Sequence, residues 1–521
     1  MQQTLDLKLF PADAAGDRQI REHIAKATGH PIKDIAGFQL VKRAIDARGR
    51  QPKVLLTVKA FIGEPFAPQP PAILHFPDVS RADRQVIVIG AGPAGLFAAL
   101  SLIQQGIRPV LLERGKDVRA RRRDLALLNK EGVINPESNY CFGEGGAGTY
   151  SDGKLYTRSN KRGDINRILA LLVQFGADSS ILVDAHPHIG TNKLPHIIQA
   201  MRQLITDSGG HFLFQKKVVD FVLHDQRIKK VRTADGDVFD GDAVILATGH
   251  SARDIYRLLH HHHILIEPKP FALGVRIEHP QQLIDKIRYG VPSPYLPPAA
   301  YSLVEQVGHK GVFSFCMCPG GIIAPASTDE GELVVNGWSP SKRNNPYANS
   351  GIVVTVEQKD MLRFEKEGAL MGLALQQSVE QKAFAVGGGR FVAPAQRMAD
   401  FVAGKVSNDL PDCSYLPGIH SASLLEVLPK FIYEDLRQGF RAFGEKMKGY
   451  FTNEAIVVAT ESRTSSPVRI PRDPVHLHHP QIVNLFPCGE GAGYAGGIVS
   501  AAMDGERVAG RLTETLKEKK R

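Results

Sequence analysis

The sequence GAGPAG at residues 90–95 allows few kinds of structure around it. It follows the apolar residues 86–89 and precedes an uncharged, mostly apolar stretch that ends near residue 103. A Gly-x-Gly-x-x-Gly run in this setting is typical of the turn between a strand and a helix in a parallel sheet that binds a dinucleotide. The whole stretch approaches the length of a membrane span, but its glycines and proline interrupt it. We therefore expect a buried strand, a tight turn and a helix.

An acidic residue follows this turn at the spacing that such a site requires. Glu113 ends the next apolar stretch, roughly twenty residues after the turn. A carboxylate at this position binds the hydroxyl groups of a ribose, while the glycines let backbone N–H groups approach a pyrophosphate. The residues that we place in the dinucleotide site on this pattern are Gly90, Gly92, Pro93, Ala94, Gly95, Glu113 and Arg114.

Three later segments also place small residues where the backbone must approach a neighbour closely. They are GEGGAGT at 143–149, ILATG at 245–249 and FPCGEGAGYAGG at 486–497. Glycine costs about 0.5–1 kcal/mol in regular structure, so this density is not expected in an ordinary surface loop. We expect the first segment to touch the bound ligand and the second to run past it.

The order of apolar and turn-forming stretches predicts an α/β protein with several domains. A chain of 521 residues is too long for one compact core. Residues 212–249 alternate short apolar stretches with polar turns and predict a β-meander. We expect a small N-terminal α+β domain with a proline-rich linker (1–80), a Rossmann-like domain assembled from 84–160, 205–262 and 451–521, and an inserted α+β substrate or cap domain (265–450).

Charge and cysteine content bound the setting of the protein. The formal net charge of +10 favours contact with polyanions without establishing nucleic-acid binding, which we keep as an unfavoured possibility. Five cysteines form no disulfide framework in a chain of this length, and this predicts a reducing, cytoplasmic location. No secretory signal or membrane partner is expected. The oligomeric state stays open.

With these motifs in place, the sequence resembles the FAD-binding superfamily of glutathione reductase. The segments FGEGGAGTYSDGKL, ILATGHSARD, FCMCPGG and ESRTSSPVRI are similar to bacterial FAD-dependent dehydrogenases of unassigned substrate, and the resemblance covers nearly the whole chain. It implies that both glycine-rich ends close one FAD site. The superfamily usually has Asp where Glu490 stands, which shifts this carboxylate by one methylene. The cofactor residues that the later segments and the resemblance add are Gly145, Gly146, Gly148, Thr149, Val218, Ala247, Thr248, Gly249, Gly489, Glu490, Gly497 and Ile498.

The segment VFSFCMCPGG offers two thiols for chemistry. In a regular strand, Cys316 and Cys318 share one face at a spacing of about 6.6 Å, near the upper limit for the Cα atoms of a disulfide. One interpretation is a redox pair beside the flavin. The other is a pair of buried thiols that pack as small apolar groups.

Single polar side chains complete the catalytic candidates. Arg463 could bind a substrate carboxylate through two hydrogen bonds, or it could belong to a structural ion pair. His250, directly after the ATG turn, and His420 could donate protons near neutral pH, although single histidines are more often structural. The basic run VRARRRD at 118–124 could attract a polyanion or the phosphate of NADPH, but a solvated helix face explains it more simply.

The sequence predicts neither a metal site nor a separate NAD(P)H domain. The histidine runs at 260–263 and 476–479 lack the spacing of metal ligands, so we expect no metal site. We find no separate Gly-x-Gly-x-x-Gly turn for NAD(P)H, because the further matches at 143–148 and 491–496 lie in segments assigned to FAD. NAD(P)H is therefore expected, if at all, as a transient electron donor without a domain of its own.

Together these observations predict an FAD-dependent oxidoreductase. The leading hypothesis is a dehydrogenase that moves a hydride between flavin N5 and an unidentified small-molecule substrate. Two alternatives stay open. The net charge and the N-terminal domain are compatible with a flavin-dependent RNA-modifying enzyme, and the paired thiols with a non-catalytic flavin/thiol redox sensor.

Overall fold

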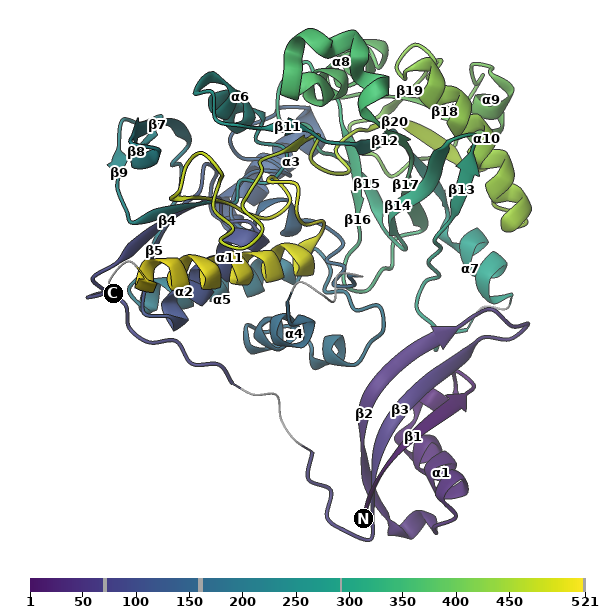
Figure 1. Cartoon of the computed structure of the whole chain (residues 1–521). Coiled ribbons are helices and arrows are strands. Elements are labelled where there is room, and N and C mark those ends of the chain that lie inside the picture. Colours follow the sequence, from purple (N-terminus) through teal and green to yellow (C-terminus); the bar gives the residue numbers. More distant parts are fainter. Residues whose placement is uncertain (69–72, 158–162, 291–292, 519–521) are drawn as a thin grey trace.

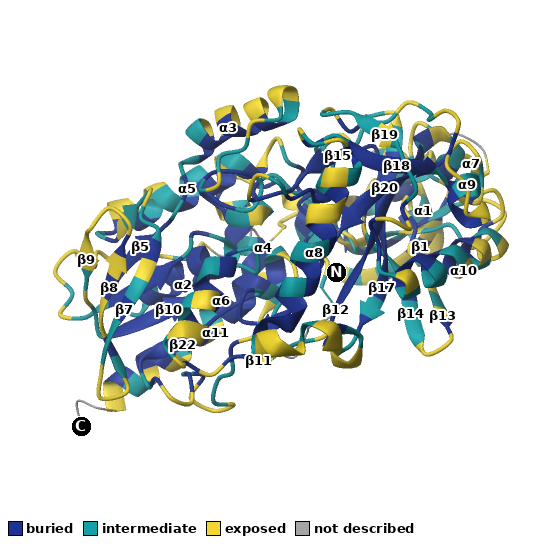
Figure 2. Cartoon of the chain, turned by 90° about the horizontal axis from the view of Figure 1, so that it is seen from above, coloured by how far each residue is buried: buried dark blue, intermediate teal, exposed yellow. Residues whose placement is uncertain are grey.

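The computed structural model describes residues 1–68, 73–157, 163–290 and 293–518. The chain has a mixed α/β fold with a parallel sheet, as predicted, and its N-terminal unit lies apart from a larger body (Figure 1). The predicted boundary at residue 160, part of the proline-rich linker and the last three residues lie outside the described residues. Figure 2 shows the buried residues concentrated in the strands of the body and in the helices beside them.

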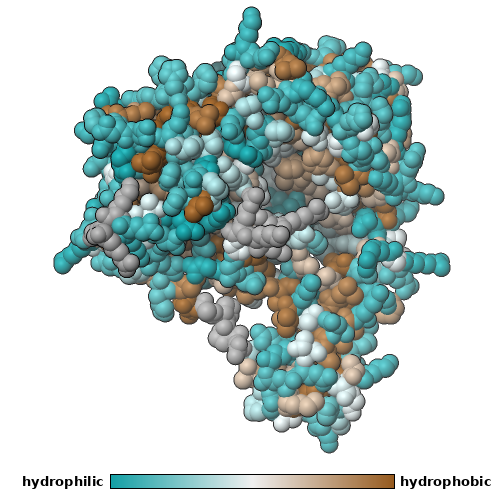
Figure 3. Space-filling model, viewed as in Figure 1, coloured by the Kyte–Doolittle hydropathy of each residue, from teal (hydrophilic) through white to brown (hydrophobic). Residues whose placement is uncertain are grey.

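The N-terminal unit is a three-stranded antiparallel sheet covered by one helix. It contains β1 (Gln2–Leu9), α1 (Asp17–Thr28), β2 (Ile35–Asp46) and β3 (Lys53–Ile62), in the sheet order β1-β3-β2. Burial alternates along β3, and Ile20 and Ile24 of α1 pack into the same core. On β2, Arg43 joins this unit to the body through an ion pair with Asp184, at 2.6 Å from Nε to Oδ1. The unit projects from the body with a mainly hydrophilic surface (Figure 3).

A five-stranded parallel sheet forms the first half of the body. Its order is β22 (Leu485–Pro487), β10 (Ala243–Leu246), β4 (Gln85–Ile89), β5 (Arg108–Leu112) and β6 (His211–Leu213). The first strand of the body, β4, and the last strand of the chain, β22, therefore lie in one sheet. This arrangement brings the glycine run after β4 and the glycine run after β22 to the same edge, because the carboxyl ends of parallel strands lie together.

Alternating side chains of this sheet enter two separate cores. Val86 and Val88 face a core that contains α2 (Pro93–Gln104), α4 (Ile165–Gln174), α5 (Leu194–Asp207) and α11 (Ile498–Glu518). Ile87 and Ile89 face the other core, which is closed by α6 (Arg253–His261) and by the meander β7 (Val218–His224), β8 (Arg227–Thr233) and β9 (Val238–Phe239). Helix α3 (Val118–Glu131) follows β5.

The second half of the body is a seven-stranded sheet. Its order is β13 (Val304–Val307), β14 (Lys310–Cys318), β17 (Tyr347–Val356), β12 (Phe271–Pro280), β20 (Ile456–Glu461), β18 (Ala393–Arg397) and β19 (Ile419–Ser421). Strand β20 pairs with β12 and β18, so this sheet takes in residues from the segment 451–521 that the sequence assigned to the dinucleotide domain.

Helices and a short hairpin complete the second half. The helices are α7 (Gln281–Tyr289), α8 (Met371–Val386), α9 (Met398–Ala403) and α10 (Lys430–Lys446), and the hairpin is β15 (Ile322–Pro325) with β16 (Val335–Trp338). The chain enters this half through β11 (Glu267–Pro268) and leaves it through β21 (Val468–Arg469), which pair antiparallel. None of the described helices combines the length and apolar character needed to cross a bilayer.

Candidate FAD and substrate site

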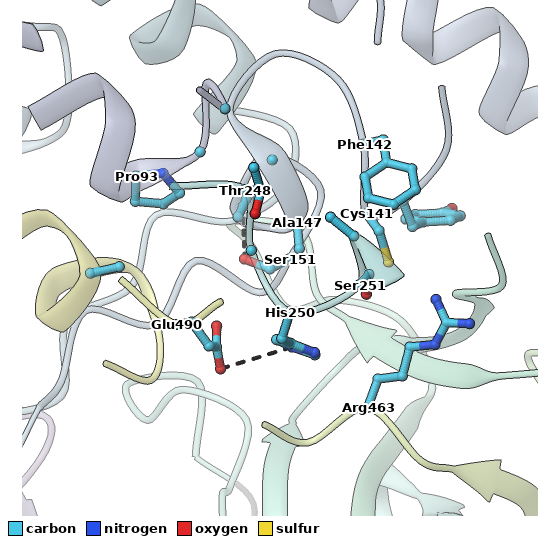
Figure 4. Close-up of a pocket in the computed structure, with 18 of the residues that line it drawn as sticks. Pro93, Cys141, Phe142, Ala147, Ser151, Thr248, His250, Ser251, Arg463 and Glu490 are labelled. Atoms are coloured by element: carbon cyan, nitrogen blue, oxygen red, sulfur yellow. Dashed lines mark hydrogen bonds and ion pairs between the residues drawn. The ribbon is translucent and has the colours of Figure 1, made fainter. Parts of the chain in front are cut away.

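A cavity lies between the two halves of the body. On one side it is lined by the glycine turn after β4, by the loop of residues 140–154 and by the residues that follow β10. On the other side it reaches β14 and β16 of the seven-stranded sheet. Figure 4 shows Pro93, Thr248 and Arg463 arranged around this space. The cavity thus begins at the carboxyl ends of the parallel strands, where α/β sheets bind their ligands.

Most of the residues that the sequence placed in a cofactor site line this cavity. They are Gly90, Gly92, Pro93, Ala94, Glu113, Arg114, Gly146, Gly148, Val218, Ala247, Thr248, Gly249, Glu490, Gly497 and Ile498. The four catalytic candidates, Cys316, Cys318, Arg463 and His250, line it as well. His420 is not among the lining residues.

Four predicted cofactor residues support the wall without lining the cavity: Gly95, Gly145, Thr149 and Gly489. A Cβ on Gly95 would lie 1.9 Å from the carbonyl oxygen of Gly90, so only glycine lets α2 pack on the turn. The Gly145 N–H donates to the carbonyl oxygen of Ala91 at 2.9 Å and joins two glycine segments. The other two are held by hydrogen bonds to Glu144 and Asp504.

The turn after β4 leaves a helix end open to the cavity. Gly90 has a φ of +101°, and a Cβ there would lie 2.5 Å from the carbonyl oxygen of Ala247. Helix α2 begins at Pro93, and its N-cap residue Gly92 provides no capping side chain. The first N–H groups of the helix and the positive end of its dipole are thus left for an anionic ligand.

Glu113 organises this turn and keeps one acceptor position for a ligand. Its Oε2 accepts the Ala91 N–H at 2.9 Å, and its Oε1 accepts the N–H groups of Gly115 and Gly143 at 2.8 and 3.0 Å. A carboxylate has about four lone-pair positions, so one on Oε2 is not used by these bonds. That position can accept a hydroxyl group from the cavity.

A buried arginine shapes the loop that follows. Arg121 on α3 is fully buried, and its guanidinium donates at 2.8 to 3.0 Å to four loop carbonyl oxygens, those of Asn139, Tyr140, Glu144 and Gly146. The sequence placed this residue on a solvated helix face, and that interpretation is wrong for it although the neighbouring arginines are exposed. Arg121 lies at helical spacing from Val118, Leu125 and Leu128, which are on the buried face of α3. This spacing in the sequence could have indicated that Arg121 is buried.

Charged and aromatic side chains surround the end of the cavity beside β5. Arg114 lies over the Phe142 ring, with its guanidinium carbon 4.1 Å from the ring centroid. The same guanidinium donates to Glu137 at 2.7 Å and to Asp254 at 2.9 Å. Val218 also lines the cavity, as do Lys216 and Lys217, which directly precede it in the sequence. This end therefore offers an apolar surface and a fixed cation.

His250 and Glu490 meet at the opposite end, with His250 Nε2 3.9 Å from Glu490 Oε1 (Figure 4). Burial, together with the nearby cation of Arg463, lowers the pKa of His250 to about 4. Burial raises the pKa of Glu490 to about 7, while Lys269 opposes this change. At neutral pH the imidazole is therefore neutral and the carboxyl group is close to half protonated, so this pair can hold or release a proton beside the cavity.

The two thiols lie in a β-bulge on the far wall. The register of β14 against β17 shifts between Phe315 and Cys318, and Cys316 has a φ of +44°. The regular strand expected from the sequence is thus broken at these residues. Cys316 is exposed to the cavity, Cys318 is buried, and both thiols are free. The Cys318 thiol donates to the Cys316 carbonyl oxygen at 3.3 Å.

Two cations that sequence reasoning missed contact the inner thiol. Lys154 Nζ lies 3.8 Å and Arg276 Nη2 lies 3.7 Å from Cys318 Sγ. The fully buried Arg276 is held by Glu461 at 2.7 Å. Although Cys316 reaches the cavity, the surrounding protein limits its hydration and raises its pKa to about 11, against the cation of Lys154, and burial also raises the pKa of Cys318. Both thiols are therefore protonated at neutral pH.

Arg463 belongs to a buried ion cluster that joins the two halves of the body. Its Nη2 lies 2.9 Å from Glu380 and 3.3 Å from Glu332, and Arg253 of α6 binds the same two carboxylates at 2.8 Å. Its Nη1 donates to Thr328 at 2.8 Å. With its guanidinium engaged in this way, the structure favours the ion-pair interpretation of Arg463 over the binding of a substrate carboxylate.

The histidine runs have local partners. His262 Nε2 lies 2.8 Å from Asp220 Oδ1, and His479 Nε2 lies 2.9 Å from the carbonyl oxygen of Leu265. Within the described ranges, no group of three or more His, Cys, Asp or Glu side chains is arranged to hold a metal ion.

The cavity fits FAD at three separate places. Glu113 retains an acceptor for a ribose hydroxyl, and α2 presents free N–H groups for a diphosphate. Gly92 and Gly146 lie in close backbone contact in the wall and carry no side chains that would fill the cavity. A Cβ on Gly146 would lie 3.0 Å from the Cα of Gly92. Helix α11 begins at Ile498 on the cavity wall, where its N-terminus can stabilise a negative charge.

Family models agree with this fit. Residues 83–127 match an FAD binding domain, and residues 270–464 match a family described as FAD-dependent protein, C-terminal domain-like. Residues 1–61 match a domain of unknown function. The glutathione-reductase-like superfamily expected from the sequence is not confirmed, because the matching FAD binding domain belongs to a different branch.

Solved structures, and one relative that matches over a short segment, show weaker likenesses. A phytoene desaturase (lycopene-forming) of Pseudescherichia vulneris is 36% identical over 87 residues, which is 17% of each chain. The 2,6-dihydroxypyridine-3-hydroxylase of Arthrobacter nicotinovorans aligns with a TM-score of 0.35 at 11% identity over 84% of each chain. A geranylgeranyl bacteriochlorophyll reductase-like protein of Thermoplasma acidophilum aligns with a TM-score of 0.35 at 12% identity, over 84% of this chain and 79% of that one.

A relative with unassigned function covers nearly the whole chain. An uncharacterized protein of Clostridium beijerinckii is 38% identical over 517 residues, which is 95% of this chain and 96% of that protein. The chain belongs to the same family as this protein, and the FAD-dependent family models that it matches identify FAD as its cofactor.

Proposed function

We propose that this chain is an FAD-dependent oxidoreductase of the dehydrogenase type, which moves a hydride between flavin N5 and a small-molecule substrate. The observation that carries the proposal is the shape of the cavity, which continues from the glycine segments to β14 and β16 of the other half. The second half thus adds a compartment beyond the part that fits the cofactor. When bound, FAD supplies the two-electron chemistry, and the protein supplies position and electrostatics.

The residues of the far compartment suit a substrate that is partly apolar. Phe315 and Trp338 offer ring surfaces, and Asn336 offers an amide, all on the cavity wall. Lys154 contributes a cation on the same side, held by the carbonyl oxygen of Met317. Pockets of this kind use a few polar groups to orient a ligand that apolar groups bury.

His250 and Glu490 would manage the proton that accompanies the hydride. Their facing atoms lie at the cavity, 3.9 Å apart. Efficient general acids and bases have a pKa near the working pH, and the value of about 7 for Glu490 meets this condition. We assign the proton to the Glu490 carboxyl group and a positioning role to His250.

The test is an anaerobic reduction of the FAD-loaded protein. Candidate alcohols, amines and hydroxy acids are added without NAD(P)H, and loss of the visible absorbance of oxidised flavin is followed with product analysis. A substrate that bleaches the flavin and appears as its two-electron oxidised product supports the proposal. Flavin that is reduced only by NAD(P)H, and that then inserts an oxygen atom from O₂ into an organic substrate, would identify a hydroxylase and overturn it.

A further inference from the structure

Thiols are concentrated at the cavity to an unusual degree. Four of the five cysteines line it, and two of these, Cys316 and Cys318, are separated by one residue. We propose that these two form a reversible disulfide that exchanges two electrons with FAD, so that the protein stores a second electron pair beside its flavin. The inference rests on the FAD site and is independent of which small molecule the enzyme oxidises.

A β-bulge interrupts the regular strand at the two residues. In a regular strand their Cα atoms are about 6.6 Å apart, near the limit of about 6.8 Å for a disulfide. Here Phe315 pairs with Gly351 and Cys318 with Asn349, so two residues on β14 face one on β17. The Cys318 thiol turns back to within 3.3 Å of the Cys316 carbonyl oxygen. The strand is therefore irregular at the two residues that an S–S bridge would join.

The backbone of Cys316 adopts a conformation that side chains rarely take. Its φ of +44° lies in the left-handed region, which costs a residue with a Cβ about 1 kcal/mol or more. The consequence is that the Cys316 side chain is exposed to the cavity although its neighbours Met317 and Cys318 are buried. A strained residue that serves packing alone would bury its side chain, whereas this one presents its thiol.

The cations beside Cys318 suit a thiol that ionises during its reaction. Lys154 and Arg276 approach the sulfur at 3.8 and 3.7 Å, and Arg276 also donates to the Cys316 carbonyl oxygen at 2.7 Å. Each cation also has a carboxylate partner, Glu461 for Arg276 at 2.7 Å and Asp152 for Lys154 at 3.6 Å, so both charges are held beside the sulfur whether or not the thiol ionises. A transient thiolate is the nucleophile in disulfide formation, and cations stabilise it.

The electrons and atoms balance with FAD alone as the oxidant. Two S–H bonds break and one S–S bond forms between Cys316 and Cys318. The two electrons and two protons that leave the thiols reduce FAD to its dihydro form. In the reverse direction, reduced flavin returns them and restores the two thiols.

Anaerobic titration with dithionite tests this without any substrate. The FAD-loaded protein is first oxidised with diamide, and the reagent is removed. The wild-type protein is expected to accept four electrons per FAD, two in the flavin and two in the disulfide. Cys316→Ser and Cys318→Ser are each expected to accept two. Cys413→Ser, which changes a cysteine outside the cavity lining, is the control and is expected to accept four.

Peptide mapping keeps the test decisive if a serine variant loses its FAD. The diamide-treated wild-type protein is digested without reduction, and the peptide with both cysteines should have lost two hydrogen atoms and resist alkylation. A wild-type protein that accepts two electrons, with both thiols still open to alkylation, would overturn the inference. That result would leave the proposed substrate oxidation untouched, because the flavin would still be reduced.

Discussion

The two sides of the cavity are built from different parts of the chain. The side at the parallel sheet is mainly backbone, with glycines at its closest contacts and buried side chains such as Glu113 and Arg121 bound to main-chain atoms behind it. The side at the seven-stranded sheet presents side chains such as Phe315 and Trp338, with buried ion pairs such as that of Arg276 and Glu461 behind them. A diphosphate is recognised by any backbone that presents N–H groups, whereas a substrate is selected by particular side chains. Under the proposed function, FAD would therefore be bound mainly by the first side, and the substrate would be selected mainly by the second.

The largest expected effect tests the far side. Arg276→Met leaves Glu461 as an unpaired charge in the core, which should lower the free energy of unfolding by about 3–5 kcal/mol. The double variant Arg276→Met, Glu461→Met removes both charges and should recover most of this loss. Urea unfolding of the FAD-loaded proteins measures both changes. If the double variant is as unstable as the single one, the charges of this wall do not stabilise each other as a pair.

The next effect tests the backbone side. Gly95→Ala places a Cβ 1.9 Å from the carbonyl oxygen of Gly90, so α2 must shift away from the turn. We expect a loss of about 1–3 kcal/mol in stability, as in an overpacked core, together with loss of bound FAD measured by absorbance per chain. Gly510→Ala is the matched control, because a Cβ there meets nothing within 4 Å on helix α11. Equal behaviour of the two variants would contradict the packing argument.

A smaller effect depends on pH and lies where the two sides meet. In the folded protein the pKa of Glu490 is raised from 4.5 to about 7. Its contribution to stability is therefore complete below pH 4.5 and is lost as the pH rises through about 7. Glu490→Gln cannot ionise, so its stability relative to the wild type should increase over this window and then level off. His250, with a lowered pKa, contributes in the opposite direction in both proteins. A constant difference across pH would show that Glu490 is not buried as described.

The smallest effect on stability is expected at Gly92. Its φ is −74°, and a Cβ there would have only the Cα of Gly146 nearby, at 4.0 Å. Gly92→Ala should change the free energy of unfolding without FAD by less than about 0.5 kcal/mol. It should still weaken FAD binding, because the added methyl group faces the cavity. Equilibrium titration with FAD, with Gly510→Ala again as the control, separates these outcomes.

Local patterns made part of this site predictable from the sequence. The turn at Gly90 and the carboxylate of Glu113 depend on steric and hydrogen-bonding contacts between residues no more than about thirty positions apart. Their spacing in the sequence was therefore enough to predict them. The assignment of single residues to FAD contacts stays a prediction, although most of the predicted residues line one cavity.

Long-range contacts set the limit of that reasoning. Arg121 binds carbonyl groups that its own helix does not reveal, and the cluster around Arg463 draws on Arg253, Glu332 and Glu380. The bulge at Cys316 depends on the partner strand, which the sequence does not name. Arg276 was also missed, although charged residues within the apolar stretch FALGVRIEHP, here Arg276 and Glu278, indicate buried partners.

The ribbon of β11 and β21 has a consequence for how proteins of this kind diversify. The polypeptide enters the seven-stranded half at Pro268 and returns beside it at Val468, and the Lys269 N–H donates to the Pro467 carbonyl oxygen at 2.9 Å next to this pair. A segment anchored in this way can be lengthened, shortened or replaced by recombination while the parallel sheet and its glycine segments keep their geometry. One FAD-binding domain could in this way catalyse different reactions after exchange of the single segment between β11 and β21.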